Sequence, residues 1–229
     1  MSDYYTLITA LPWLPDLDQC KQLPLSRIAL EQRLTMLSEQ DRQQLLRVES
    51  LYHPSDPALK ELTDRALVSA WQAQLELVQS QPLRECVLYQ MELRTLLAAL
   101  RSRSSGLENP MHFFGLGRWL PRIRKHWFEP AFGLEDVYPP VKELQRLLSK
   151  DNPMLVERYL SQLLWRDLSH TEHEHHFTFE TLACFVLRWG IAEQYIQHDG
   201  VLALERFNHS VAALLASTDL ELQLAQGVR

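Results

Sequence analysis

The chain has 229 residues with 23 basic and 29 acidic side chains, so its formal net charge at pH 7 is -6. This length can bury a sizeable core in one large domain or two small ones without disulfides or metal. The net negative charge favours solubility and excludes a general attraction to nucleic acid or anionic lipid. A surface for either would have to be local.

The first segment, residues 4–12, is aromatic and aliphatic. The only charge ahead of it is Asp3, whereas a secretory signal needs a basic region before its apolar core. The apolar run is also too short to span a bilayer. We therefore expect no leader, and an N-terminus that docks against the rest of the fold.

Helical signals follow in the N-terminal part of a chain that is poor in glycine. Ser38 is typical of an N-cap, because acidic residues come directly after it. Asp56-Pro57 opens a second helix, which we expect to end near Ser80-Gln81-Pro82, since proline disfavours helical geometry in the residue before it. A third helix is predicted from about Arg84 to Arg101, with an apolar stripe at helical spacing.

The middle of the chain, residues 102–140, is rich in proline and glycine and predicts loops and short helices. Amphipathic helices are predicted at about 153–168 and 179–197, the second with Trp189 in its buried stripe. Asp199-Gly200 marks a turn. An apolar stripe from Val201 to Leu215 then predicts a last helix.

These elements predict an all-α fold of packed helical bundles. We expect an N-terminal helical half at residues 1–101 and a C-terminal helical half at 141–218. The region 102–140 connects them, and a polar tail follows at 219–229.

The cysteines Cys20, Cys86 and Cys184 are odd in number and widely spaced. Such a set indicates neither a disulfide framework nor a zinc ribbon, and it fits buried thiols in a reducing cytoplasm.

Sequence signatures of catalysis are missing. The chain has no phosphate-binding loop, no nucleophile elbow and no glycine fingerprint after a strand. Gly115-Leu116-Gly117 is only a fragment of such a fingerprint, and the bulky Arg118-Trp119 follows where a pyrophosphate would need small residues. We expect a protein without an active site or a cofactor.

Histidines and glutamates are concentrated at residues 170–176. If this stretch were helical, His170, His173 and Glu174 would share a face, and with His176 they are the candidate ligands for zinc or nickel. The metalloprotease pattern fails because Phe177 stands where its second histidine is needed. We predict a polar linker, partly protonated below about pH 6.5, with a metal site as the alternative.

Basic and aromatic residues alternate between residues 118 and 128, a stretch we call the basic-aromatic segment. Such a segment could bind an acidic protein surface, lipid headgroups or single-stranded nucleic acid. Alternatively, Trp119, Ile123 and Trp127 form the buried stripe of a short helix and the arginines stay in solvent. The acidic charge of the whole chain speaks against nucleic acid. The candidate partner-interface residues are Arg118, Trp119, Arg122, Arg124, Lys125 and Trp127.

Three segments carry a resemblance to a known family. They are residues 4–12 (YYTLITALP), the helix at 84–101, and the block from Trp165 to Leu168 that leads to Phe179-Glu180-Thr181-Leu182. Together they look like a bacterial family of unassigned function that is similar to the C subunit of V-type ATPases, the relative of the eukaryotic d subunit. The genes of that family tend to lie among those of the ATPase.

The resemblance implies a structural role. The C subunit is all-α and funnel-shaped, and it couples the rotating central stalk to the membrane ring without doing chemistry. By resemblance, the expected partners are central-stalk and membrane-ring subunits, and the chain would be cytoplasmic and peripheral on the membrane through the complex. The C subunit is built from three similar helical bundles, whereas this chain has room for two at most, so it would replace that subunit or supplement it. The alternatives are a free-standing helical adaptor with another partner and a His-cluster metalloprotein.

Overall fold

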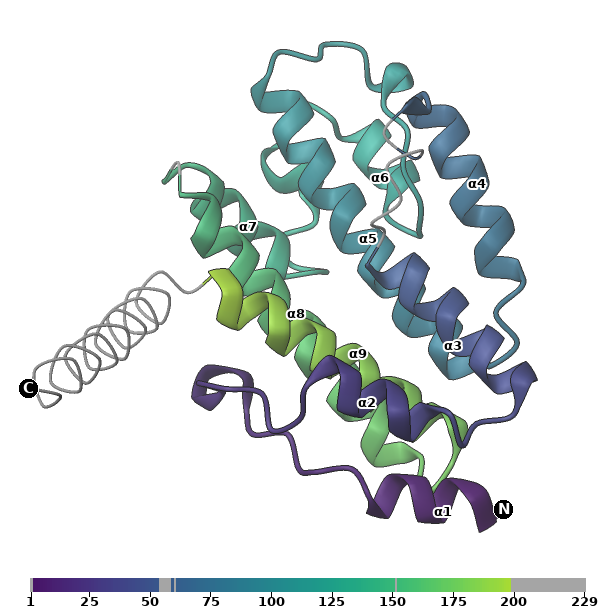
Figure 1. Ribbon diagram of the computed structural model, residues 1–229. Coiled ribbons are helices and arrows are strands. Elements are labelled where there is room, and N and C mark those ends of the chain that lie inside the picture. The colour runs from purple at the N-terminus through teal and green to yellow at the C-terminus, as the bar shows by residue number, and fades with distance from the viewer. Residues whose placement is uncertain (1, 54–58, 60, 151, 199–229) are drawn as a thin grey trace, which may run out of the picture.

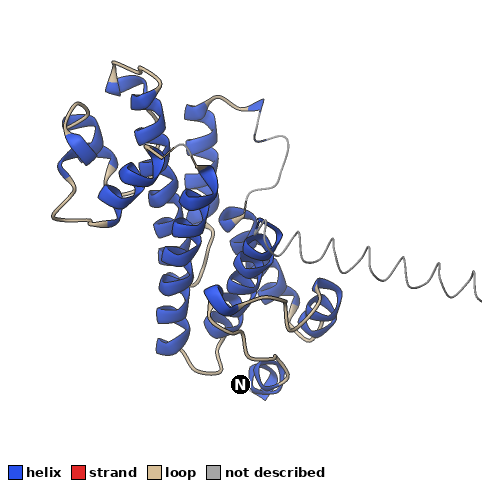
Figure 2. Ribbon diagram, turned by 90° about the vertical axis from the view of Figure 1, so that its left-hand side faces the viewer, coloured by secondary structure: helices blue, strands red, loops and turns tan. Residues whose placement is uncertain are grey.

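The computed structural model describes residues 2–53, 59, 61–150 and 152–198, and within these residues it contains helices and no strand (Figure 2). The predicted all-α fold is confirmed. Several predictions lie outside the described residues: the helix start at Asp56-Pro57, the turn at Asp199-Gly200, the stripe from Val201 to Leu215 and the tail at 219–229.

The helices follow the chain in the order shown in Figure 1. They are α1 (Ser2–Thr9), α2 (Arg27–Leu34), α3 (Glu39–Tyr52), α4 (Asp64–Glu76), α5 (Gln81–Ser104), α6 (Leu120–Lys125), α7 (Pro140–Leu148), α8 (Pro153–Glu174) and α9 (Phe179–His198). Within the described ranges, none of them is both long enough and apolar enough to cross a bilayer.

Local capping chemistry fixes several helix starts. The hydroxyls of Ser26, Ser38 and Thr63 accept hydrogen bonds from backbone N–H groups in the first turns of α2, α3 and α4, which confirms the predicted cap at Ser38. The prediction for Pro82 is wrong, because α4 already ends at Glu76 and Pro82 lies in the first turn of α5. Proline is tolerated there because the first N–H groups of a helix have no intrahelical partner.

Buried apolar side chains form two clusters among the described residues. The first draws on α1, α2, α3, the first half of α5, the end of α8 and α9. The second combines the end of α5 with α6, α7 and the start of α8. The expected halves 1–101 and 141–218 therefore do not have separate cores, because the long helices α5 and α8 pass through both clusters.

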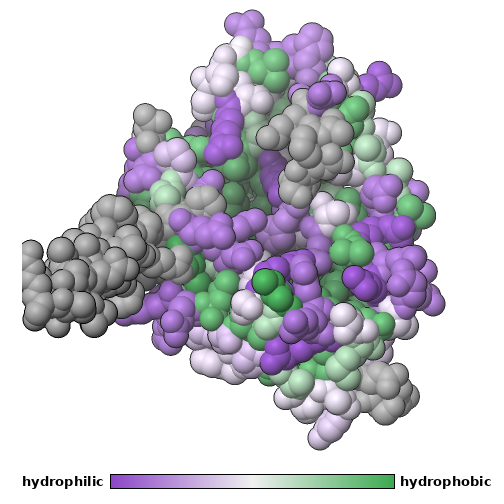
Figure 3. Space-filling model, in the orientation of Figure 1, coloured by the Kyte–Doolittle hydropathy of each residue, from purple (hydrophilic) through white to green (hydrophobic). Residues whose placement is uncertain are grey.

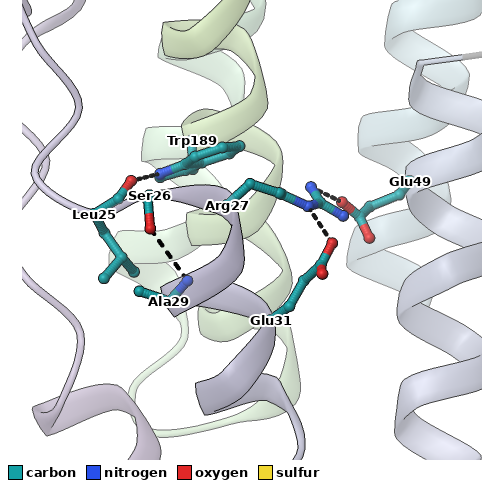
Figure 4. Close-up of polar contacts among 7 residues, drawn as sticks. All are labelled: Leu25, Ser26, Arg27, Ala29, Glu31, Glu49 and Trp189. Carbon is teal, nitrogen blue, oxygen red and sulfur yellow. Dashed lines mark hydrogen bonds and ion pairs between the residues drawn. The ribbon is translucent and has the colours of Figure 1, made fainter.

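Trp189 joins α9 to the start of α2 (Figure 4). Its side chain is fully buried, and its indole Nε1 donates to the Leu25 carbonyl at 2.9 Å. The guanidinium of Arg27 lies 5.7 Å from the centre of the Trp189 ring and forms ion pairs with Glu31 at 2.8 Å and Glu49 at 3.0 Å. One buried ring and one arginine thus tie three helices together.

The surface drawn in Figure 3 mixes hydrophilic and hydrophobic residues over the whole visible face. Hydrophobic residues are most visible inside a hollow in its upper half and as small separate patches below. Scattered apolar residues are normal on a soluble protein, so the informative places are those where they gather around a groove or cavity.

Candidate partner-binding groove

The aromatic residues of the basic-aromatic segment lie mainly in the second core cluster. Ile123 and Trp127 are buried and Trp119 is half-buried, as the structural interpretation predicts. The Trp127 indole donates to the Leu107 carbonyl at 2.8 Å, and its ring lies 5.6 Å from that of Phe132. Trp127 is therefore removed from the candidate interface, because its side chain has no surface to offer a partner.

The arginines of the segment bind loop carbonyls rather than standing free in water. Arg124 is half-buried and donates to the Phe113 carbonyl at 2.7 Å, so the prediction that it is solvated is wrong. Arg122 is exposed, and it donates to the Gly133 carbonyl. A long cationic side chain can satisfy a loop carbonyl while its stem packs on apolar surface, which spacing along the sequence does not reveal.

The carbonyl held by Arg122 belongs to a strained turn. Ala131, Phe132 and Gly133 have φ angles of 44°, 57° and 62°, in the left-handed region, and the two non-glycine residues are fully buried. Such backbone costs energy for L-residues and persists only where the surroundings hold it. The guanidinium of Arg103 supports the turn from α5, 4.7 Å from the centre of the Phe132 ring.

Arg118 is tied to a buried carboxylate on α5. Glu92 is 4% exposed; one of its oxygens accepts the Arg118 backbone N–H at 2.8 Å, and the other pairs with the Arg118 guanidinium at 3.2 Å. Gly117, at a φ of 99°, approaches so closely that an added Cβ would lie 2.1 Å from Glu92 Cγ. The Gly-Leu-Gly fragment thus serves the close docking of a loop on a helix.

Three candidates of the basic-aromatic segment remain exposed: Arg118, Arg122 and Lys125. Arg118 and Arg122 already have protein partners, and Lys125 is the remaining exposed cation of the segment. The structure therefore assigns most of the segment to holding the loops between α5 and α7.

The histidine cluster is largely helical, which corrects the predicted linker. α8 continues to Glu174, so only residues 175–178 connect α8 to α9. His170 contacts Glu174 at 3.5 Å with both side chains exposed, and His173 Nδ1 bonds to the Ser169 carbonyl. Among the described residues, no three histidine, cysteine or acidic side chains are arranged to hold a metal ion. His170, His173, Glu174 and His176 are not brought together as a ligand set.

A groove of about 610 Å³ lies beside the second half of this cluster, between the segment that follows α1 and the junction of α8 with α9. In Figure 1 this junction is at the bottom of the molecule, at the opposite end from α6. The groove, which we call the aromatic groove, is lined by apolar side chains and histidines: Ile8, Leu11, Trp13, Leu14, Phe177, Phe185, His173, His175 and His176.

Large aromatic side chains stand exposed at the aromatic groove. Trp13 is 76% exposed, Tyr5 57% and Phe177 46%. The ring centroids of Tyr5 and Phe177 are 4.9 Å apart, and Trp13 and Phe177 line the same groove. Exposed aromatic side chains gathered around a groove are typical of a site that binds another molecule.

Phe177 is held outward by a strained backbone. Its φ is 55°, which is rare for a bulky side chain. The turn is fixed on its N-terminal side, where the Thr181 hydroxyl donates to the His175 carbonyl at 2.7 Å. Strain of this kind is concentrated at functional sites, so it supports a binding role for the exposed ring.

A partly buried ion pair forms part of the lining of the aromatic groove. Arg188 of α9 is 9% exposed, and it pairs with Glu172 of α8. Its guanidinium also lies 4.4 Å from the centre of the Trp165 ring. Removing Glu172 would leave the buried Arg188 without a counter-charge, so this contact helps to fix the relative position of α8 and α9.

Sequence reasoning missed Trp13, Tyr5 and Phe177 as candidate site residues. One signal was available, because Trp13 stands close to prolines on both sides and cannot lie inside a helix. No sequence pattern predicts the groove itself. Its walls come from segments more than 150 residues apart, and a local pattern cannot relate them.

A half-buried carboxyl, that of Asp167, lies between α5 and α8. Burial raises the pKa of Asp167 to about 6, and its Oδ2 has no hydrogen-bond partner within the described residues. The Cys86 thiol is 3.3 Å from the Thr171 hydroxyl, and contact with Cys86 together with burial raises the pKa of Cys184. The Cys184 thiol is therefore protonated and unreactive at neutral pH.

Replacing Asp167 by asparagine is expected to raise the free energy of unfolding at pH 7.5 by about 3 kcal/mol. The carboxyl pKa is about 6 in the fold against 3.8 as its ordinary value, so the folded state binds more protons between these pH values. The contribution of Asp167 to the stability of the wild type is thus complete below about pH 4 and is lost as the pH rises through 6.

The measurement is urea unfolding of wild type and Asp167→Asn between pH 4 and 8. The difference between the two proteins is read at each pH, because His53, whose pKa burial lowers to about 4, titrates in the same range in both. A difference that does not grow with pH would contradict the assignment.

Comparison with known proteins gives one result. A family model described as "Protein of unknown function (DUF2764)" matches residues 62–216, which is more than half of the chain. The match begins near the start of α4 and covers α5 to α9, so it includes one wall of the aromatic groove. No curated protein and no solved structure matches the chain significantly.

Proposed function

The chain belongs to the family described as "Protein of unknown function (DUF2764)", and we propose that it acts as a non-catalytic helical subunit or accessory of a V-type ATPase. It binds central-stalk and membrane-ring subunits in the cytoplasm and reaches the membrane surface through them. The aromatic groove is the binding surface in this proposal.

The observation that carries the proposal is the exposure of Trp13, Tyr5 and Phe177 around one groove. Protein interfaces are enriched in aromatic residues, and a few buried tryptophan, tyrosine and arginine side chains supply most of the binding energy. A rigid aromatic ring gains large contact area at a low cost in side-chain entropy, and here a constrained backbone already fixes the position of Phe177.

The resemblance to the C subunit of V-type ATPases supports the choice of partner. Two of the three segments that carry it meet at the aromatic groove: residues 4–12 supply Ile8, Leu11 and Pro12, and the block from Trp165 to Leu182 supplies Thr181. The third, residues 84–101, is part of α5 and runs through both core clusters. The segments that carry the resemblance thus contribute both to the helical core and to the candidate interface.

The competing function is that of a helical adaptor for some other partner. It uses the same groove, so only the identity of the bound protein separates the two. A metalloprotein has less support, because no three histidine, cysteine or acidic side chains among the described residues are arranged to hold a metal ion.

The test is binding of the purified full chain to purified V-type ATPase stalk and ring subunits encoded beside it. Trp13→Ala and Phe177→Gly are expected to weaken binding at least about tenfold each, because truncation of an interface anchor costs upwards of about 1–2 kcal/mol. Glycine at position 177 suits the positive φ, so that variant removes the ring without straining the fold.

Lys125→Glu is the matched control, since it changes the exposed end of the basic-aromatic segment and leaves the aromatic groove intact. Wild-type affinity of this variant together with loss in Trp13→Ala supports the groove. The reverse pattern would move the interface to the basic-aromatic segment. Absence of binding by the wild type to every subunit would overturn the proposed function.

A further inference from the structure

A second cavity, of about 280 Å³, lies between the end of α3, the middle of α5, the start of α8 and the end of α9. It is separate from the aromatic groove and shares no lining residue with it. Much of its wall is aliphatic, supplied by Leu93, Leu160, Leu164 and Ile191. Ligand sites of small molecules have this character, with apolar walls and a few polar groups that fix orientation.

Two polar side chains of α5 form the inner end of the cavity. Gln90 and Arg94 are one helical turn apart, and both donate to the Tyr52 carbonyl at the end of α3, at 2.6 Å and 3.2 Å. This shared acceptor is one of the carbonyls that a helix end leaves unpaired. It holds both side chains in fixed positions, as a preorganised site requires.

Gln90 keeps an unused acceptor in this position. Its side chain is 3% exposed, and Oε1 has no hydrogen-bond partner among the described residues. Buried polar atoms without a partner are rare, and each one calls for an explanation such as a bound molecule. A ligand with a hydroxyl or N–H group would supply the missing donor.

The positive charge of Arg94, one helical turn from Gln90, has no counter-charge among the described residues. The guanidinium is half-buried, and within the described part of the chain no carboxylate lies at ion-pair distance from it. Burial lowers its pKa, and burial together with this charge keeps neighbouring His53 neutral at physiological pH. Glu157 also lines the cavity, but from its solvent-exposed side. A half-buried cation without a counter-charge favours an anion.

We propose that this cavity binds a small amphipathic carboxylic acid that carries a hydroxyl or amide N–H close to its carboxylate. The carboxylate pairs with Arg94, the neighbouring donor bonds to Gln90 Oε1, and the apolar part packs against Leu93, Leu164 and Ile191. This binding site is independent of the proposed ATPase contact, because it lies on other surfaces of the chain.

The experiment is calorimetric titration of the full chain with three related compounds. The first, 3-phenyllactate, has the carboxylate, the hydroxyl and an apolar ring; 3-phenylpropionate lacks the hydroxyl, and 3-phenylpropan-1-ol lacks the carboxylate. We expect 3-phenyllactate to bind best, and removal of the carboxylate to weaken binding about tenfold or more, as for a charge-assisted hydrogen bond. This series needs no variant, so it does not depend on any mutant folding.

Variants assign the two contacts. Arg94→Gln is expected to abolish the preference for the acids over the alcohol, whereas Arg101→Gln, on an exposed position of the same helix, leaves it unchanged. Gln90→Leu is expected to weaken 3-phenyllactate but not 3-phenylpropionate, because only the first compound uses Oε1. Equal binding of acid and alcohol to the wild type, or no binding of any compound at millimolar concentration, would overturn the proposal.

Discussion

Replacing Trp189 by alanine is expected to lower the free energy of unfolding by roughly 3–5 kcal/mol, the usual cost of truncating a large buried aromatic side chain. The ring is fully buried in the first core cluster. The change also leaves the Leu25 carbonyl without its indole donor and Arg27 without the ring it covers (Figure 4). The junction of α9 with α2 would lose its main contact.

The measurement is urea unfolding followed by circular dichroism, with Trp13→Ala as the matched control. The same substitution at Trp13, which is 76% exposed, should change the free energy of unfolding by no more than about 0.5 kcal/mol. Equal unfolding midpoints for Trp189→Ala and Trp13→Ala would show that α9 does not bury the face described here.

Replacing Gly117 by alanine is expected to cost roughly 3 kcal/mol or more, since backbone strain and overpacking each cost about 1–3 kcal/mol. A φ of 99° is strained for any residue with a Cβ, and the new methyl group would collide with Glu92 Cγ at 2.1 Å. Relief of that collision would pull the buried carboxylate away from the Arg118 N–H.

Gly106→Ala separates the two causes. Gly106 has a φ of 88°, but an added Cβ would meet no atom within 4 Å, so this variant carries the backbone strain alone. It should lose about 1 kcal/mol. If thermal unfolding showed equal losses for the two variants, the close docking of the Gly-Leu-Gly loop on α5 would be wrong.

The sequence predicts those parts of the fold that depend on local signals. The cap at Ser38, the short elements between α5 and α7 and the helix carrying Trp189 all follow from neighbours within a few residues, and the structure confirms them. The predicted helix end at Pro82 is wrong, because a proline can either follow one helix or stand in the first turn of the next. Its role depends on where α4 ends, which packing decides.

The candidate site was predicted poorly for a physical reason. A charged side chain in a sequence predicts exposure to solvent. In the structure, however, Arg124 and Arg122 donate to loop carbonyls. Glu92 is buried by the loop whose backbone N–H it accepts. These contacts cross 11 to 26 positions in the chain. Exposed aromatic residues are equally hard to recognise in a sequence. The helical spacing that predicts burial of Trp127 does not indicate whether Trp13 is buried or exposed.

The central claim, a structural role in a V-type ATPase, is tested most directly by purifying the tagged full chain from its own cells in mild detergent at moderate salt. We predict that stalk and membrane-ring subunits of the ATPase are recovered with it in fixed proportion, and that Trp13→Ala loses them while remaining folded. Recovery of the wild-type chain alone, or with a different set of proteins, would contradict the proposed role.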